Sequence, residues 1–160
     1  MVKVAKSCLP FVLVVFSLVT ACGGVGADYP DTPPPLHLLQ LYPRNGETGV
    51  PTDVQVLAVF DDDLFEADTT GCDVPEGFEQ SFAFVTCADS GVVDFSAGCY
   101  RRTDGDGQPS GEPDPSIMVL APASALENDT EYCVRIPGSL SGINTSQLGS
   151  DIESMFRTAP

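Results

Sequence analysis

Apolar and polar residues alternate with a period of two along much of this chain. The clearest segments are 54–60, 82–85, 93–95 and 132–136, in which apolar side chains occupy every second position. Such alternation is typical of strands with one buried face, and clusters of Gly, Pro, Asp and Asn separate the segments. Because one sheet cannot cover its own apolar face, the pattern predicts two packed antiparallel sheets. We therefore expect an all-β sandwich of about seven short strands over ~120 residues.

Residues 1–22 follow a different pattern. Lys3 and Lys6 precede an apolar run at 9–19, which leads to small residues and Cys22. A basic start, an apolar middle and small residues at the end are typical of a secretory signal peptide. A membrane-spanning helix needs about 20 apolar residues, and this run is shorter and interrupted by a proline and a serine. An ordinary cleaved signal, which would release a soluble product, is the other alternative.

The tetrad Val19-Thr20-Ala21-Cys22 resembles the lipobox of bacterial lipoproteins. The resemblance implies that a signal peptidase removes residues 1–21. It also implies that the Cys22 thiol carries a diacylglycerol and the new amino group a further fatty acid such as palmitate. Two or three acyl chains hold a protein on a lipid bilayer durably, whereas one holds it marginally. Gly23 is consistent with the outer membrane of a two-membrane cell, so the expected location is the cell envelope.

Residues 22–35 are rich in Gly and then in Pro, with three consecutive prolines at 33–35. Proline runs adopt extended polyproline geometry and act as semi-rigid spacers. We expect this segment to be a tether that lifts the folded domain, residues 36–160, off the bilayer.

The charge of the chain becomes more negative once the signal is removed. Residues 22–160 contain 5 Arg and no Lys against 23 Asp and Glu, a formal charge of 5 − 23 = −18. A domain this acidic repels nucleic acid and anionic lipid headgroups, so neither is an expected partner, and it attracts divalent cations. The apolar fraction of 42% is ordinary and regularly patterned, which argues against a disordered chain.

Cysteine usage indicates two disulfides. Cys8 lies in the signal and Cys22 in the lipobox, so four of the six cysteines remain. These are Cys72, Cys87, Cys99 and Cys133. An even number in an exported chain indicates disulfides, and four cysteines allow three connectivities. Zinc is the alternative, but the sequence has no CxxC spacing and its single histidine is His37.

Five short motifs follow one another along the chain. Residues 41–51 contain Pro-x-x-Gly-x-x-x-Val-Pro, and 54–60 form a strand that ends in Phe. Residues 120–126 contain a Pro and then a Leu, 130–134 read Thr-x-Tyr-x-Val, and 156–158 read Phe-x-Thr. This ordered set resembles bacterial Ig-like domains of the S-layer-protein (SbsA-like) type, over almost the whole mature domain. The resemblance implies an Ig-like antiparallel β-sandwich. The four cysteines and a long insertion depart from the family pattern.

The resemblance has implications for Tyr132 and for the cysteines. The ring of Tyr132 is expected in the core, with its hydroxyl on a backbone partner near the start of the strand. In Ig-like sandwiches the strands that hold Cys87 and Cys133 are neighbours, and alternation turns both side chains outward. This favours a Cys87–Cys133 bridge and leaves Cys72–Cys99. The sequence-local alternative, Cys72–Cys87 with Cys99–Cys133, stays open.

Two acidic segments are candidate cation sites. In the segment 103–114, Asp104 and Asp106 alternate as they do at the start of a calcium loop, but Pro115 stands where the bidentate acid is expected. An acidic hairpin tip is the alternative. In the second segment, 61–68, adjacent carboxylates on an extended chain point to opposite faces, which predicts a solvated loop. Calcium is therefore the only cofactor considered.

No motif in the sequence combines a nucleophile with a base, and His37 has no acidic or cysteine partner near it in sequence. We therefore expect a non-enzymatic, lipid-anchored envelope protein, either a structural spacer or a module that binds a protein or glycan partner. The strongest binding candidate is the insertion at 101–116, because loops longer than about 12 residues are usually functional or disordered. A calcium-dependent binding module that uses the 103–114 loop is the first alternative. An unrecognised envelope enzyme is the second.

Overall fold

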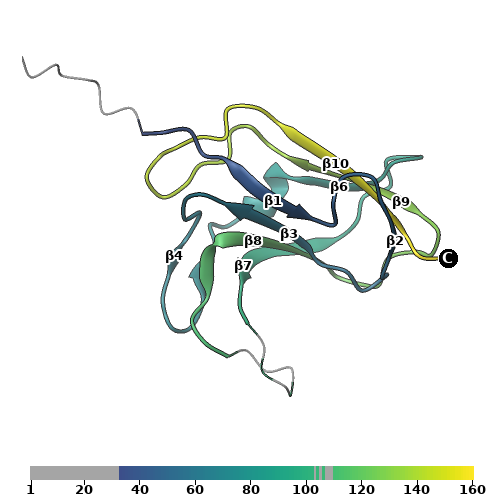
Figure 1. The fold of residues 1–160 in the computed structure, drawn as a ribbon, viewed down its shortest axis with the longest axis horizontal. Helices are drawn as coiled ribbons and strands as arrows, with labels where there is room; N and C mark the ends of the chain where they lie inside the picture. The colour runs from purple at the N-terminus through teal and green to yellow at the C-terminus, as the bar shows by residue number, and fades with distance from the viewer. Residues whose placement is uncertain (1–32, 103, 105, 107–109) are drawn as a thin grey trace, which may run out of the picture. The chain divides into compact units, whose positions relative to one another are not determined.

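Two four-stranded sheets pack face to face in the computed structural model, which describes residues 33–102, 104, 106 and 110–160 (Figure 1). Sheet A has the order β1-β3-β8-β7, formed by Leu38–Tyr42, Val56–Phe60, Asp114–Pro122 and Phe95–Tyr100. Sheet B has the order β2-β10-β9-β6, formed by Glu47–Val50, Ile152–Thr158, Glu131–Ile136 and Ala83–Thr86. Between β3 and β6 the chain forms a small hairpin and a 3₁₀ turn: β4 (Glu66–Ala67), β5 (Cys72–Asp73) and η1 (Phe78–Ser81). The described chain contains no α-helix, which confirms the predicted all-β sandwich.

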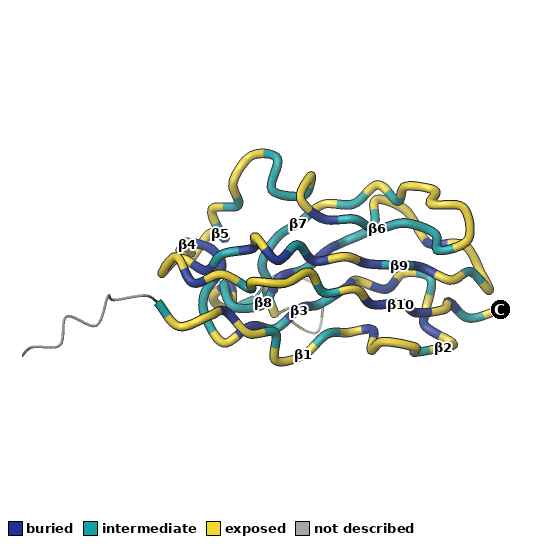
Figure 2. Tube along the Cα trace, turned by 90° about the horizontal axis from the view of Figure 1, so that it is seen from above, coloured by how far each residue is buried: buried dark blue, intermediate teal, exposed yellow. Residues whose placement is uncertain are grey.

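The core lies between the two sheets and is built from the alternate residues that the sequence pattern marks. In β3 the buried side chains are Val56, Ala58 and Phe60, and in β9 every second side chain is buried in the same way (Figure 2). Fully burying a Val, Leu, Ile or Phe side chain stabilises a fold by about 1.5–3 kcal/mol. The eighteen buried apolar residues of this cluster therefore supply the main driving force for folding.

One strand pair departs from the predicted antiparallel arrangement. β2 runs parallel to β10, with Phe156 opposite Glu47. The cause is that the N-terminal segment changes sheets: β1 pairs with β3 in sheet A, and after a short turn the chain continues as β2 along β10 in sheet B. Asn45 and Gly46 hold this crossing in place, because the Asn45 Oδ1 accepts from the Met155 N–H at 3.0 Å and the Gly46 N–H donates to the Met155 carbonyl at 2.7 Å.

The two disulfides have the pairing that alternation favoured. Cys87–Cys133 joins the end of β6 to β9, with a Cα–Cα distance of 5.2 Å. Cys72–Cys99 joins β5 to β7, with a Cα–Cα distance of 6.1 Å. Each bridge closes a loop of the unfolded chain, and such bridges typically stabilise a domain by about 2–4 kcal/mol. Cys87–Cys133 therefore links two neighbouring strands of sheet B, and Cys72–Cys99 links the small hairpin to sheet A.

Tyr132 occupies the position that the sequence implies. Its ring stacks on Phe156 with centroids 5.8 Å apart and meets the edge of Phe84 at 5.9 Å. The Tyr132 hydroxyl accepts from the Glu127 backbone N–H at 2.9 Å, just before β9 begins. The expected backbone partner near the strand start is thereby confirmed, and the side chain ties the loop before β9 to the core.

The described residues include no helix that is long and apolar enough to cross a membrane. The predicted signal peptide at 1–21, the lipidation site Cys22 and most of the tether at 22–35 lie outside the described residues. The part of the chain expected to fold begins with a buried side chain: Leu36 is 1% exposed, and its N–H donates to the Gln147 carbonyl at 3.0 Å.

We predict that Tyr132→Phe destabilises the protein by about 1–2 kcal/mol, because the partly buried Glu127 N–H loses its acceptor while the ring stays in place. Tyr100→Phe is the matched control, since that side chain is 37% exposed, and it should leave stability unchanged. Urea unfolding with the disulfides intact measures the free energy of unfolding of both variants. Equal midpoints for the two variants would contradict this assignment of the hydroxyl.

Candidate interaction surface

The central strands of sheet A, β3 and β8, are apolar on both of their faces. In β3, Leu57 and Val59 point away from the buried Val56, Ala58 and Phe60, and they are not among the side chains that pack against the core. A strand with one solvated face ordinarily alternates apolar with polar residues, whereas continuous apolar runs are typical of strands covered on both sides. The outer face of sheet A therefore differs from an ordinary solvated sheet face.

The register of β3 and β8 gathers these outward apolar side chains into a block. In β8, Ile117, Val119 and Ala121 alternate with buried residues and point outward. Leu57 lies opposite Val119, and Val59 lies opposite Ile117. Directly opposite side chains in an antiparallel pair have Cβ atoms about 5 Å apart, so they contact one another. The result is a two-by-two block of aliphatic side chains, with Ala121 at its end.

The aliphatic side chains of this block are half-buried, and the flanking strands border it with polar as well as apolar residues: Gln40 lies opposite Val59, and Ser96 lies opposite Ala121. On β1, Tyr42 lies opposite Leu57 and is 37% exposed. On β7, Gly98 lies opposite Val119, and a Cβ built on Gly98 would meet no other atom within 4 Å. The space directly above Gly98 is therefore open. We call this surface the outer apolar face and define it by Tyr42, Leu57, Val59, Ile117, Val119 and Ala121.

The outer face of sheet B has the opposite character. Most exposed outward positions of β9 and β10 are charged, and Met155, 45% exposed, is the apolar exception; the charged ones are Glu131, Arg135, Glu153 and Arg157. Both arginines are already paired: Arg135 with Asp151, and the Arg157 Nε with the Asp129 Oδ1 at 2.9 Å. The Gly138 N–H, followed by Arg135, holds the pKa of the Asp151 carboxyl below its usual value. This face is therefore an ordinary solvated surface with its charges balanced locally.

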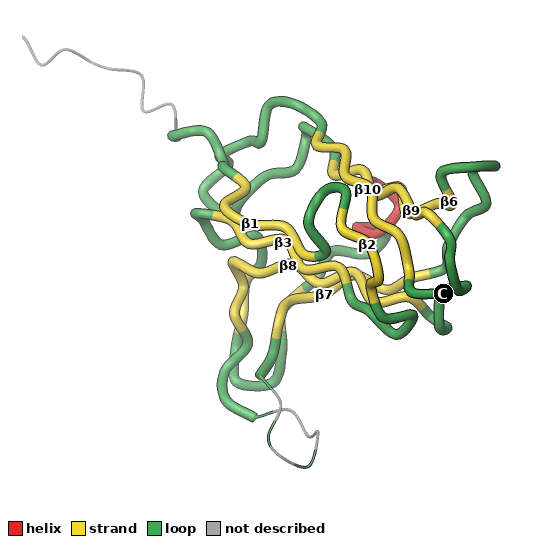
Figure 3. Tube along the Cα trace, turned by 45° about the vertical axis from the view of Figure 1, so that its right-hand side comes forward, coloured by secondary structure: helices red, strands yellow, loops and turns green. Residues whose placement is uncertain are grey.

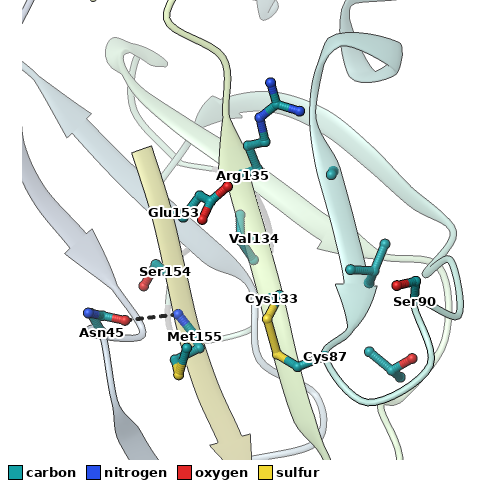
Figure 4. A pocket seen from close by; sticks show the side chains of 12 residues that line it. Asn45, Cys87, Ser90, Cys133, Val134, Arg135, Glu153, Ser154 and Met155 are labelled. Carbon is teal, nitrogen blue, oxygen red and sulfur yellow. Dashed lines mark hydrogen bonds between the residues drawn. A yellow bond between two sulfur atoms is a disulfide. The ribbon is translucent and has the colours of Figure 1, made fainter. Parts of the chain in front are cut away.

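A shallow groove of about 490 Å³ runs over sheet B beside the Cys87–Cys133 disulfide (Figure 4). Two of its polar side chains are occupied within the protein. Arg135 is paired, and the Asn45 carbonyl oxygen accepts from the Met155 N–H. The Ser154 hydroxyl is buried and has no hydrogen-bond partner in the described part of the chain. Glu153 also lines the groove, but it is exposed on the face of β10 opposite to that of Ser154, so no base is hydrogen-bonded to this hydroxyl.

The acidic segment after β3 is a structural junction rather than only a solvated loop. The Asp61 carboxylate accepts from the His37 backbone N–H at 2.8 Å and lies 2.7 Å from the His37 Nδ1. These contacts, the backbone one first, hold the pKa of Asp61 below its usual value. The Asp62 carboxylate accepts from the Asn144 side-chain amide at 3.0 Å and from the Ser146 hydroxyl at 2.9 Å. The carboxylates thus join three chain segments and do not converge on an ion.

The described ends of the connection from β7 to β8, residues 101–102 and 110–113 of the expected insertion at 101–116, extend away from the sheets as an arm (Figure 3). Arg101 fastens the base of this arm to the β4–β5 hairpin. Its guanidinium donates to the carbonyl oxygens of Thr69, Thr70 and Gly111 at 2.9, 3.0 and 3.2 Å. β8 already begins at Asp114, so the last part of the expected insertion is strand.

The calcium candidates lie on this arm. The Asp106 N–H donates to the Asp104 Oδ1 at 3.0 Å, but residues 103, 105 and 107–109 lie outside the described chain. Within the residues that the structure does describe, no group of three or more His, Cys, Asp or Glu side chains could hold a metal ion. The calcium loop therefore stays a prediction.

Sequence reasoning missed the outer apolar face. It treated Leu57 and Val59 as the exposed partners of buried residues and gave no weight to their own apolar character. The signal was present in two uninterrupted apolar runs, at 56–60 and 117–121, which ordinary alternation does not explain. Only the register of β3 against β8 shows that the two runs face the same way.

Comparisons with known proteins agree with this architecture. No curated protein matches the sequence significantly. A similar solved structure is native alpha-2-macroglobulin from Escherichia coli spanning domains MG0-NIE-MG1, with 18% identity and a TM-score of 0.50. The match covers 78% of this chain and 32% of that one, so the likeness concerns the fold of one part of a longer protein. The family profile of the bacterial Ig-like domain matches residues 31–158, and the chain therefore belongs to the bacterial Ig-like domain family.

Proposed function

We propose that this protein is a non-enzymatic, lipid-anchored module of the bacterial cell envelope that binds a protein partner through the outer apolar face. The observation that supports this most is the contrast between the two sheets. One outer face is mostly charged, with both of its arginines paired, and the other presents six uncharged residues in register on β1, β3 and β8. Contiguous apolar patches on soluble domains mark interaction sites, because their exposure to water costs free energy.

The composition of the face favours a protein over a glycan. Five of its six residues are aliphatic, and hydrogen-bonding groups lie only at the margins of this block, where Gln40 is opposite Val59 and Ser96 is opposite Ala121. A glycan presents many hydroxyl groups, which would lose water there without gaining partners. Tyr42 at the margin adds an exposed aromatic side chain, a residue type that is enriched in protein interfaces. The base of the arm, at Arg101, follows the end of β7 in the same sheet.

Anchoring by Cys22 would hold this face near the membrane surface without burying it. The lipobox-like tetrad and the Gly- and Pro-rich segment at 22–35 support this part of the proposal. The formal charge of −18 for residues 22–160, counted as 5 − 23, keeps the domain off anionic headgroups, so the outer apolar face stays available to a partner in the aqueous phase.

We predict that Cys22→Ser moves the protein from the membrane fraction to the soluble or unprocessed pool, because the acyl chains have no other attachment point. Cys8→Ser is the matched control, since that residue lies in the predicted signal and leaves the mature chain unchanged. Intact-mass measurement of the membrane-extracted protein supplies the second readout. A mature chain with an unmodified Cys22 would rule out the lipid anchor.

A photo-crosslinking amino acid at position 121 should give a discrete protein adduct in intact envelopes, because Ala121 lies at the end of the outer apolar face. The same amino acid at position 85 is the control: Val85 lines the groove on the outer face of sheet B, and it should give no adduct. Gel electrophoresis after irradiation separates the outcomes. Adducts from position 85 but not from 121 would place the partner on the other sheet and contradict the proposal.

The calcium-dependent alternative has a simple thermal test. We expect millimolar calcium to leave the melting temperature unchanged, because Pro115 stands where the bidentate acid of a calcium loop belongs. Differential scanning fluorimetry with and without chelator measures this. A calcium-induced rise that the double variant Asp104→Asn, Asp106→Asn abolishes would instead favour a calcium-dependent module.

A further inference from the structure

The outer apolar face lies between acidic groups at both ends of its strands. Asp53 precedes β3 and Asp61 follows it, while Asp94 precedes β7 and Asp114 begins β8. All four residues are exposed. The face therefore combines an uncharged centre with acidic ends.

Basic groups near the same ends offset this arrangement only in part: His37 contacts Asp61, and the exposed Arg102 follows Arg101 after β7. Arg101 follows β7, but its guanidinium already donates to the carbonyl oxygens of Thr69, Thr70 and Gly111. Arg44 lies beyond the end of β1. The four carboxylates outnumber the three arginines at these ends, and the excess of acid extends over the whole domain, which carries 5 Arg and no Lys after the predicted signal.

From this arrangement we infer the chemistry of the partner: a protein surface with an apolar centre flanked by Lys or Arg side chains. The inference rests on the proposed docking function and adds the identity of the complementary surface. Burial of the aliphatic block supplies the affinity. The basic side chains at the edges of the partner lie against the acidic ends of this face. This attraction raises the association rate, and repulsion disfavours acidic partners. Binding is therefore weakened by salt, because exposed charges are screened within about 10 Å at 0.1 M ionic strength.

The same charges argue against a second copy of this chain as the occupant. Two copies docked face to face would bring acidic ends into proximity, and each carries a formal charge of −18 (5 − 23 over residues 22–160). Like charges opposed across an interface cost several kcal/mol. Anionic lipid headgroups are disfavoured for the same reason. A basic protein surface is the occupant whose charge complements this face.

The test uses ¹⁵N-labelled chain 22–160 with Cys22→Ser and both disulfides formed, which retains the entire core and all ten strands described above. Three synthetic peptides serve as probes, each with eight residues in strict alternation: Lys with Val, Glu with Val, and Lys with Ser. We expect the Lys-Val peptide to shift the amide signals of β3 and β8, and to lose roughly tenfold in affinity between low and high salt. The Glu-Val and Lys-Ser peptides should bind at least tenfold more weakly, since one lacks the charge and the other the apolar side chains.

Two variants locate the binding. Val119→Thr replaces a methyl group by a hydroxyl at the centre of the outer apolar face and keeps the β-branched shape, so it should weaken Lys-Val binding several-fold while the protein stays folded. Val85→Thr makes the same change on the outer face of sheet B and should leave the affinity unchanged. The disulfide-intact melting temperature of both variants confirms that each is folded.

The outcomes separate the inference from the function on which it rests. Equal binding of the Glu-Val and Lys-Val peptides, with loss on Val119→Thr, would overturn the basic partner and leave the docking face standing. Sedimentation experiments measure self-association of the chain. Self-association that Val119→Thr abolishes would also overturn the basic partner, and it would identify a second copy of the chain as the occupant of the docking face. Loss of binding on Val85→Thr but not on Val119→Thr would overturn both. If none of the peptides bound, the charge inference would fall, and crosslinking from position 121 would decide the docking function.

Discussion

The antiparallel register between β3 and β8 is the constraint on which the rest of this structure depends. Val56 opposite Leu120 and Ala58 opposite Met118 place the buried halves of two central strands in the core. The same register turns Leu57 toward solvent. Because side chains alternate between faces, a slip of one residue would exchange the buried and exposed sets of β3. Core formation and the composition of the outer face are therefore set by one pairing.

The two sheets differ in the interactions that they contribute. Sheet B contains three features that stabilise the fold: Tyr132, the Cys87–Cys133 bridge and the parallel β2–β10 pair. Its exposed arginines are paired with carboxylates. Sheet A fills its half of the core and leaves an uncharged outer surface. The Cys72–Cys99 bridge attaches the small hairpin to β7. Arg101 attaches the base of the arm to that hairpin, at the margin of the sheet. The space above Gly98, on the outer side of the sheet, is open. The proposed partner surface and the attachments of sheet B thus lie on opposite sides of the sandwich.

Much of the fold could be predicted from local periodicity, because burial between two sheets imposes a period of two on each strand. The ring of Tyr132 and the favoured cysteine pairing followed from the same pattern together with the family resemblance. The parallel β2–β10 pair could not be predicted, since it depends on where a short segment changes sheets. The Asp62 contacts with Asn144 and Ser146 join residues more than 80 positions apart, and no local pattern encodes such a meeting. The outer apolar face could be recognised only from the register of β3 against β8.

The central claim is that this face is open in the isolated protein and covered in the envelope. Carbene footprinting labels aliphatic side chains according to their contact with solvent, and it can be applied to the purified domain and to anchored protein in intact envelopes. The account predicts that labelling of Leu57 and Val119 falls in envelopes while labelling of Val85 stays the same. Equal labelling of Leu57 and Val119 in the two preparations would contradict it.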